Sequence, residues 1–300
     1  MGKLDSVEMI GCSPRTVSIR RPYTVVYEPR PIDFLLHLPD ENYGHSMVLT
    51  NDLKILVCGG FAKDFMECLQ LKRNGTWVFY SYLNFPRSLG TAIVMPNGVY
   101  YFGGVRSPET SEFLPNGKRV WVKGPMIPKP GFEIGSGVRI SDTELLLLGG
   151  RGSESRILKY NIENRQWTRL NDMIVRRSEH SSCVFDGKII VTGGINALYD
   201  EKYLRTEVIQ LSDMTSRLSG PLKIRRLNHS MAITTFGQKP VLVAFAGAIS
   251  DSVEVWDSKN EQWKFPYVHA ESGYVRLDTS RRSYAGCVSV PTRYLFDFML

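Results

Sequence analysis

The chain has 300 residues, of which 43% are hydrophobic and 22% are charged, and its formal net charge is +7. This composition is ordinary for a soluble globular protein. No segment approaches the roughly 18 apolar residues of a transmembrane helix, and residues 1–10 lack the apolar core of a signal peptide. The positive charge is modest and spread along the chain, so it suits an acidic partner and does not require a nucleic acid.

The main feature of the sequence is an internal repeat. Four apolar runs end in a glycine pair, and a fifth ends in Ala246-Gly247. They span residues 54–60, 99–104, 144–150, 188–194 and 241–247, with steps of 44, 46, 44 and 53 between the pairs. A tryptophan follows the first glycine by 18 positions at Trp77, Trp121 and Trp167, and Trp263 follows Ala246 by 17. Repeats of this length predict a solenoid, a propeller or another array.

Each repeat carries the signals of a four-stranded β unit. A short strand that opens with small residues precedes each glycine-pair strand, at residues 44–48, 89–93, 134–138, 179–183 and 228–232. Hairpin signals such as Asn97-Gly98 and Asp186-Gly187 join the two strands. Small side chains suit an inner strand beside a central channel, and a glycine pair lets a neighbouring backbone or ring approach closely. The tryptophan then supplies a large buried area between units.

This pattern resembles the kelch repeat over nearly the whole chain, and Trp256-Asp257 is the only dipeptide typical of the rival WD repeat. The resemblance implies an all-β fold, a single closed kelch-type propeller of four-stranded blades over residues 1–300. Five blades are predicted near residues 44–87, 88–130, 131–177, 178–226 and 227–282. Ser216 in place of a tryptophan and Ala246 in place of a glycine predict looser packing of the fourth and fifth blades.

The two ends of the chain predict a sixth blade. Residues 282–288 match an inner strand and residues 294–298 a second strand. Residues 23–27 and 34–39 match the third and outer strands, with Phe34 at the tryptophan position. We expect a composite blade of residues 15–39 and 283–300, which closes the ring and removes exposed sheet edges.

Arginines recur in the links that lead from one blade to the next. These links and the loops after the glycine pairs are expected to share one face, where guanidinium groups grip the carboxylates of a partner. Two long segments, 195–205 and 266–282, add tyrosines to this face. The predicted partner-binding residues are Arg87, Ser88, Arg106, Arg151, Arg177, Ser178, Asn196, Tyr199, Arg226, Tyr274, Arg282 and Ser283. The alternative is structural, with each arginine paired to a carboxylate or carbonyl of a neighbouring blade.

Three histidines, His45, His180 and His229, occupy one position of the repeat. Histidine is a common metal ligand, but no cysteine or carboxylate stands at a matching spacing. We therefore expect structural histidines that are hydrogen-bonded at the strand starts, and neither a metal nor another cofactor.

The five cysteines are scattered and form no C-x-x-C pair. They are Cys12, Cys58, Cys68, Cys183 and Cys287, and we expect reduced thiols in a cytoplasmic protein. Asn74-Gly75-Thr76 and Asn228-His229-Ser230 match the N-glycosylation acceptor pattern, which means little without a secretion signal. Gly2 fits a short N-myristoylation pattern, and one acyl chain anchors a protein to a membrane only marginally.

The sequence therefore predicts a monomeric, non-enzymatic module that binds an acidic protein segment. A role as substrate adaptor for ubiquitination and a role in actin or cytoskeleton binding follow from the kelch resemblance alone. A mutarotase-like enzyme acting on a small sugar is the catalytic alternative, with Arg177, Arg226 and His229 as its candidate residues. The common hydrolase, metalloprotease and nucleotide-binding motifs are absent from the sequence.

Overall fold

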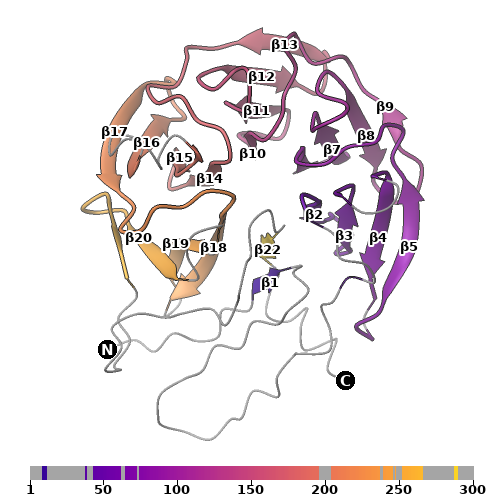
Figure 1. Cartoon of the computed structure of the whole chain (residues 1–300), viewed down its shortest axis with the longest axis horizontal. Coiled ribbons are helices and arrows are strands. Elements are labelled where there is room, and N and C mark those ends of the chain that lie inside the picture. Colours follow the sequence, from indigo (N-terminus) through magenta and orange to yellow (C-terminus); the bar gives the residue numbers. More distant parts are fainter. Residues whose placement is uncertain are drawn as a thin grey trace, which may run out of the picture.

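The computed structural model describes residues 9–11, 38, 43–61, 65–72, 74–195, 204–236, 239–245, 247, 252–265 and 287–289. The described part of the chain is all β and contains five four-stranded antiparallel sheets arranged around a centre (Figure 1). Within each sheet the strands follow one another in chain order, from the innermost to the outermost. This is the architecture of a β-propeller, with one blade per sheet.

The blades have the following strands. Blade 1 contains β2 (Ser46–Leu49), β3 (Ile55–Cys58), β4 (Glu67–Leu71) and β5 (Trp77–Tyr82). Blade 2 contains β6 (Thr91–Met95), β7 (Gly98–Phe102), β8 (Ser111–Pro115) and β9 (Val122–Lys123). Blade 3 contains β10 (Ser136–Arg139), β11 (Glu144–Leu148), β12 (Ile157–Asn161) and β13 (Gln166–Arg169).

Blade 4 contains β14 (Ser181–Phe185), β15 (Lys188–Thr192), β16 (Arg205–Gln210) and β17 (Ser216–Pro221). Blade 5 contains β18 (Ser230–Phe236), β19 (Lys239–Phe245), β20 (Val253–Asp257) and β21 (Gln262–Lys264). Each of the five sheets is built from four strands that are consecutive in the chain.

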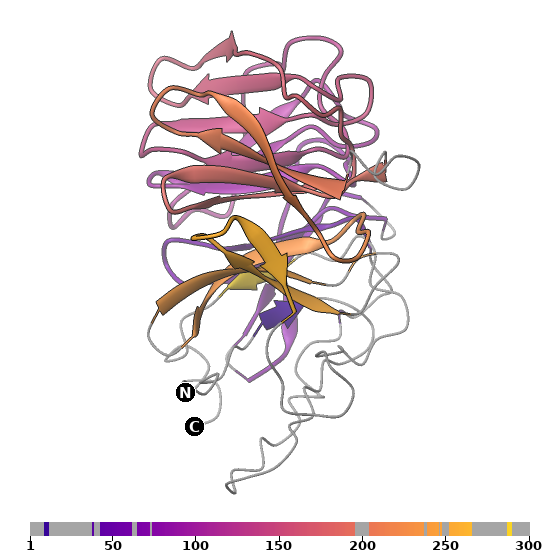
Figure 2. The same ribbon diagram turned by 90° about the vertical axis from the view of Figure 1, so that its left-hand side faces the viewer.

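The hydrophobic cores lie between successive blades, which pack face to face (Figure 2). Tyr101 of β7 packs with Leu56 of blade 1, whereas the neighbouring Tyr100 and Phe102 pack with Leu145 of blade 3. Successive side chains of a strand point to opposite faces, so one strand contributes to two cores. Both faces of the second strands are covered, which is why these strands read as unbroken apolar runs in the sequence.

The glycine pairs make room for the next blade. Gly193 has a φ of +66°, and a Cβ built there would lie 2.6 Å from Cε1 of His229 in blade 5. A Cβ on Gly149 would lie 2.5 Å from the carbonyl oxygen of Arg177. Only glycine adopts this left-handed conformation readily while leaving that space. The predicted reason for the glycine pairs is confirmed.

Two of the repeat tryptophans reach back to the preceding blade with a hydrogen bond. Trp121 donates from Nε1 to Oγ of Ser81 in blade 1 at 3.2 Å, and Trp263 donates to Oγ1 of Thr206 in blade 4 at 2.8 Å. Trp263 is fully buried. The indoles of Trp121 and Trp263 therefore combine a large buried area with a hydrogen bond across the blade interface.

Backbone hydrogen bonds link the starts of the inner strands around the channel. The amide of Leu89 donates to the carbonyl of Gly44 at 2.6 Å, and the amide of Ile134 donates to Leu89 at 3.0 Å. Glu179 then donates to Ile134, and Asn228 to Glu179, each at 2.8 Å. We name these five residues the inter-blade belt. All five have a φ between +50° and +69°, a conformation that non-glycine residues rarely adopt.

The prediction of six blades is corrected to five in the described part of the chain. Between blades 5 and 1 the structure describes two short strands, β1 (Met9–Gly11) and β22 (Cys287–Ser289), which pair with each other (Figure 1). β22 lies against both β18 and β2, as the end of the predicted inner strand should. Its described partner is Met9–Gly11, a pairing that the sequence did not predict, because the apolar pattern of a strand does not encode which segment it pairs with.

The other strands predicted for the sixth blade, at residues 23–27, 34–39 and 294–298, lie outside the described residues. The ladder hydrogen bonds of the described part run within the five blades and between β1 and β22. They join no blade to the β1–β22 pair, so they do not demonstrate a closed ring.

The expectation that all cysteines are reduced is wrong. Cys58 and Cys68 form a disulfide, with their Cα atoms 4.1 Å apart. They lie directly opposite each other on β3 and β4, a relation that depends on strand register and cannot be read from a spacing of 10 residues. Cys183 is a free, half-buried cysteine, and burial raises the pKa of its thiol to about 12. It is therefore a poor nucleophile.

Candidate functional site

One face of the propeller carries the loops that follow the glycine pairs, together with the links between blades. We name it the glycine-loop face. The two sets of segments are joined by backbone hydrogen bonds, since the amide of Gly60 donates to the carbonyl of Arg87 at 2.9 Å and Gly150 donates to Arg177 at 3.0 Å. Gly194 makes the same bond to Arg226 at 2.9 Å. Links and loops therefore lie together, as the sequence predicted.

The recurrent arginines of the links lie inside the molecule. Arg87 is 0% exposed and forms a 2.8 Å ion pair between Nη2 and Oε1 of Glu112, a residue of the next blade's third strand. Its Nη1 donates to the carbonyl of Gly103 at 2.9 Å. Burial lowers the pKa of Arg87, and Glu112 opposes that effect. The structural alternative for this arginine is confirmed.

The equivalent arginines of two later links, from blade 3 to blade 4 and from blade 4 to blade 5, are buried in the same way. Arg226 is 1% exposed, and its Nη2 lies 3.1 Å from Oε1 of Glu254. Arg177 is 0% exposed and donates to the carbonyl of Gly193 at 2.8 Å. Glu207 stands on the strand that corresponds to that of Glu254, and burial raises its pKa while Arg177 opposes the rise. These arginines tie each link to the following blade.

The two serines predicted next to these arginines are also buried. Ser88 is 0% exposed and Ser178 is 8% exposed. Arg106 and Arg151 are exposed on the glycine-loop face. The guanidinium carbon of Arg106 lies 3.9 Å from the ring centroid of Phe65, and Nη1 of Arg151 lies 3.9 Å from Oε2 of Glu133. Asn196, Tyr199, Tyr274, Arg282 and Ser283 lie outside the described residues.

Two exposed arginines were missed in the sequence. Arg176 and Arg225 directly precede the buried Arg177 and Arg226, and both are exposed. Nη2 of Arg176 lies 3.1 Å from Oε2 of Glu154, and 68% of its side chain is accessible. The Arg-Arg dipeptides carried the signal: in each pair the second arginine enters the blade interface and the first points to solvent.

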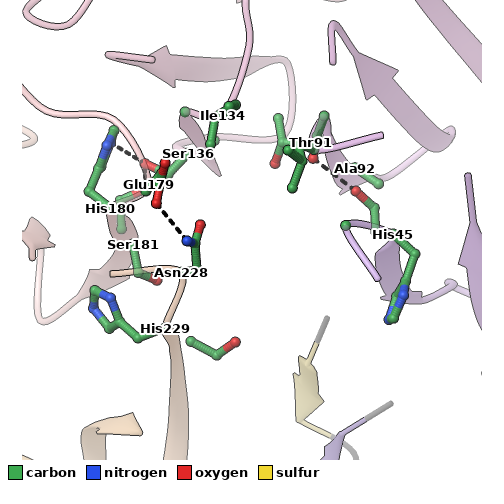
Figure 3. Close-up of a pocket in the computed structure, with 18 of the residues that line it drawn as sticks. His45, Thr91, Ala92, Ile134, Ser136, Glu179, His180, Ser181, Asn228 and His229 are labelled. Carbon is green, nitrogen blue, oxygen red and sulfur yellow. Dashed lines mark hydrogen bonds between the residues drawn. The ribbon is translucent and has the colours of Figure 1, made fainter. Parts of the chain in front are cut away.

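A pocket opens into the central channel within this face. Its volume is about 250 Å³, and the starts of the five inner strands line it. Figure 3 shows Ser136, Glu179, His180 and Asn228 grouped on one side of the pocket, with Thr91 and Ala92 across from them. At about 30 Å³ per water, this volume has room for about eight waters or for one side chain.

The polar side of the pocket is a hydrogen-bonded cluster. Oγ of Ser182 donates to Oγ of Ser136 at 2.7 Å, and Ser136 bonds Nε2 of His180 at 2.8 Å. Nδ2 of Asn228 donates to Oε2 of Glu179 at 2.6 Å. Glu179 is the single carboxylate among the residues that line the pocket. The cluster therefore offers hydroxyl, amide and carboxylate oxygens to a ligand.

His180 and His229 are neutral at physiological pH. Burial lowers the pKa of His180 to about 3, with a further contribution from the charge of Arg177. The pKa of His229 is lowered well below its usual value for the same reason, with Arg226 as its first charged neighbour, and its Nε2 bonds Oγ1 of Thr192 at 2.9 Å. Hydrogen-bonded structural roles are thus confirmed for these two histidines. Among the described residues, no group of three or more potential ligands is placed to hold a metal ion.

Comparison with known proteins supports the fold assignment. The chain is 24% identical over 177 residues to the Kelch-like protein terF of Aspergillus terreus. The resemblance to kelch-repeat propellers is confirmed. The match covers 50% of this chain and 38% of that kelch protein, so the chain spans well under two thirds of its relative. No family model matches the sequence. In the part of the chain that the structure describes, no helix has the length and apolar character needed to cross a bilayer.

Proposed function

We propose that this kelch-type propeller is a protein-interaction module that binds an acidic segment of a partner across the glycine-loop face. The observation that carries the proposal is the set of exposed arginines on the glycine-loop face, the face on which the pocket opens. They are Arg106, Arg151, Arg176 and Arg225. Guanidinium groups recognise carboxylates in bidentate fashion, and a pocket inside the cationic rim has room for a side chain of the same segment.

The present partners of the rim arginines do not prevent such binding. The carboxylates of Glu133 and Glu154 lie at the surface beside exposed guanidinium groups. Exposed ion pairs of this kind contribute about 0–1 kcal/mol each, so a partner's carboxylate replaces them at small cost. The buried pairs of Arg87 and Arg226 are not available in this way, and they are no longer part of the proposed contact surface.

The test compares capture from a cell lysate by three forms of the chain. The first is native, and the second carries Ala at the four rim arginines. The third is a control that loses four exposed cations near the hairpin turns instead: Lys118, Arg139, Arg165 and Lys259. A protein retained by the native and control forms, and lost with the rim variant, supports the proposal. Synthetic peptides from that protein, acidic or with Gln for Glu, then locate the contact.

Equal capture by all three forms would show that the rim arginines are not the contact. The identity of a captured protein also separates the partner classes considered from the sequence, because ubiquitin-ligase subunits and actin are distinguishable by mass spectrometry. The mutarotase alternative gains no support from geometry, since the side chains of Arg177 and Arg226 are buried and bonded within the blades.

We further propose that residues 15–39 and 283–300 complete a sixth blade that closes the ring. The position of β22 against β18 and β2 supports this proposal, because an inner strand of a sixth blade would lie there. A closed ring would also hold the first and fifth blades at the separation that the pocket requires.

A further inference from the structure

Two sequence motifs that match the N-glycosylation acceptor pattern have opposite environments in the fold. Asn74 and Thr76 are exposed in the turn that joins β4 to β5, on the outer part of blade 1. Asn228 and His229 line the central channel, and His229 is 7% exposed. The sequence alone does not separate these motifs, but the structure does.

The turn at Asn74 presents an acceptor amide. The amide of Lys72 donates to the carbonyl of Thr76 at 2.8 Å, and Gly75 adopts a φ of +79°, which closes the turn. Oδ1 of Asn74 accepts the backbone amide of Thr76 at 3.2 Å and its hydroxyl at 2.7 Å. The carbonyl oxygen makes these bonds in an exposed side chain, and the Nδ2 atom is the group that a glycan would join.

Asn228 is unsuited to the same modification. Its Nδ2 is engaged with Glu179 at 2.6 Å, and its backbone amide belongs to the inter-blade belt. A glycan on Nδ2 would replace that bond and fill the channel pocket. The folded chain therefore has one usable acceptor among these two motifs.

The disulfide is independent evidence for the cellular compartment in which the chain folds. Cys58 and Cys68 are joined and are 3% and 0% exposed, within the same blade as Asn74. Protein disulfides form and persist in oxidising compartments such as the endoplasmic reticulum and the extracellular space. Asparagine-linked glycans are added in secreted proteins at surface loops. We infer that the chain passes through the secretory pathway, in place of the cytoplasmic location expected from the sequence, and carries an N-linked glycan on Asn74.

The modification is the transfer of an oligosaccharide to the side-chain amide of Asn74. Nδ2 of Asn74 forms a bond to the anomeric carbon of an oligosaccharide carried on a polyprenyl diphosphate. The bond between that carbon and the diphosphate oxygen breaks, Nδ2 loses one proton, and the lipid diphosphate leaves. No electrons are transferred. The glycan lies at the start of β5, the outermost strand of blade 1, which exposes Phe79 and Tyr82. A bulky polar group there protects this edge from pairing with other chains.

The test begins with the chain isolated from the cells that produce it. Peptide mass spectrometry before and after treatment with peptide N-glycosidase shows whether Asn74 carries a glycan. Alkylation under denaturing conditions, with and without reductant, shows whether Cys58 and Cys68 are bonded. A glycopeptide at Asn74 together with a bonded cysteine pair is the expected result. An unmodified Asn74 in the isolated chain overturns the proposal, and so do free thiols at both cysteines.

Variants expressed through a eukaryotic secretory pathway then locate the site. Asn74→Gln and Thr76→Ala are expected to remove the glycosidase-sensitive mass, whereas Thr76→Ser restores an acceptor and retains it. Asn228→Gln is expected to leave that mass unchanged. A glycan that survives Asn74→Gln and disappears with Asn228→Gln would assign the modification to the channel and contradict the inference.

Discussion

Arg225 and Arg226 are neighbours in the chain, yet one is exposed and the other is 1% exposed and paired with Glu254. This contrast separates the surface role of an arginine from its structural role. Removing one partner of a buried ion pair leaves an uncompensated charge in the interior and costs about 3–5 kcal/mol. Removing an exposed cation changes the free energy of unfolding by about 0.5 kcal/mol or less.

We therefore expect Arg226→Ala to lower the free energy of unfolding by about 3–5 kcal/mol, and Arg225→Ala to leave it almost unchanged. Denaturant unfolding of both variants checks this directly. In binding assays of folded protein we expect Arg225→Ala to have the larger effect, because only Arg225 belongs to the proposed contact surface. Equal losses of stability in the two variants would contradict the assignment of buried and exposed arginines.

His180 makes the stability of the chain depend on pH. Its pKa is about 3 in the folded chain and near 6.5 in an ordinary environment. The unfolded chain therefore binds more protons between these values, and the free energy of unfolding falls as pH drops from about 6.5 toward 3. The loss amounts to at most about 1.4 kcal/mol per pH unit for one histidine.

The His180→Gln variant is expected to show a shallower pH dependence than the native chain across this range. The comparison between the two isolates the histidine, because other groups act in both. Glu207 is one of these groups, and its raised pKa has the opposite effect on the free energy of unfolding. The stabilisation from Glu207 is present at low pH and is lost as the pH rises through its pKa in the folded chain. If the free energy of unfolding had the same pH dependence in the native and variant chains, His180 would not contribute to that dependence.

At the scale of the strand, the glycine pairs determine how closely the blades approach. Gly103 and Gly187 both have a positive φ, +58° and +68°. A Cβ on Gly103 would lie 2.0 Å from the carbonyl oxygen of Phe132 in the next blade, whereas a Cβ on Gly187 meets nothing within 4 Å. A side chain at Gly187 would therefore meet only the cost of the left-handed backbone conformation, whereas a side chain at Gly103 would also clash with the next blade.

We expect Gly187→Ala to lower the free energy of unfolding by about 1–2 kcal/mol, the cost of the left-handed conformation. Gly103→Ala is expected to cost at least about twice as much, because a backbone oxygen cannot move aside as a flexible side chain does. Thermal and denaturant unfolding of the two variants give the comparison. Similar losses would mean that the blade interface adjusts to a methyl group.

The strands of the five blades were predictable from the sequence because their signals are local. The glycine pairs and the hairpin residues that mark each repeat can be recognised within a short segment of sequence. Asp186-Gly187 is an example, with φ values of 52° and 68°. The directions of Arg176 and Arg177 were not predictable, because they depend on tertiary contacts: Arg176 pairs with Glu154, and Arg177 donates to the carbonyl of Gly193 in the following blade. The Cys58–Cys68 bond was missed for a similar reason, since strand register brings the two residues together.

At the scale of the whole molecule, the pairing of β1 with β22 brings together two ends of the chain. Ile10 lies opposite Val288. The sequence predicted that both ends contribute to one blade, but it did not predict that Met9–Gly11 pair with β22. Many short strands fit an apolar pattern of this kind, and only tertiary contacts select the pair that forms.

A cross-link tests this pairing. In a background with Ser at Cys12 and Cys287, we expect Ile10→Cys with Val288→Cys to form a disulfide under mild oxidation, because directly opposed residues bring their Cβ atoms within bonding distance. A bond across so long a loop is expected to raise the free energy of unfolding by up to about 5 kcal/mol. Mobility on non-reducing gels and denaturant unfolding with and without reductant measure both effects.

The matched control is Met9→Cys with Val288→Cys, in which neighbouring strand positions point to opposite faces. Equal cross-linking of the two pairs would show that the register of β1 and β22 is not fixed.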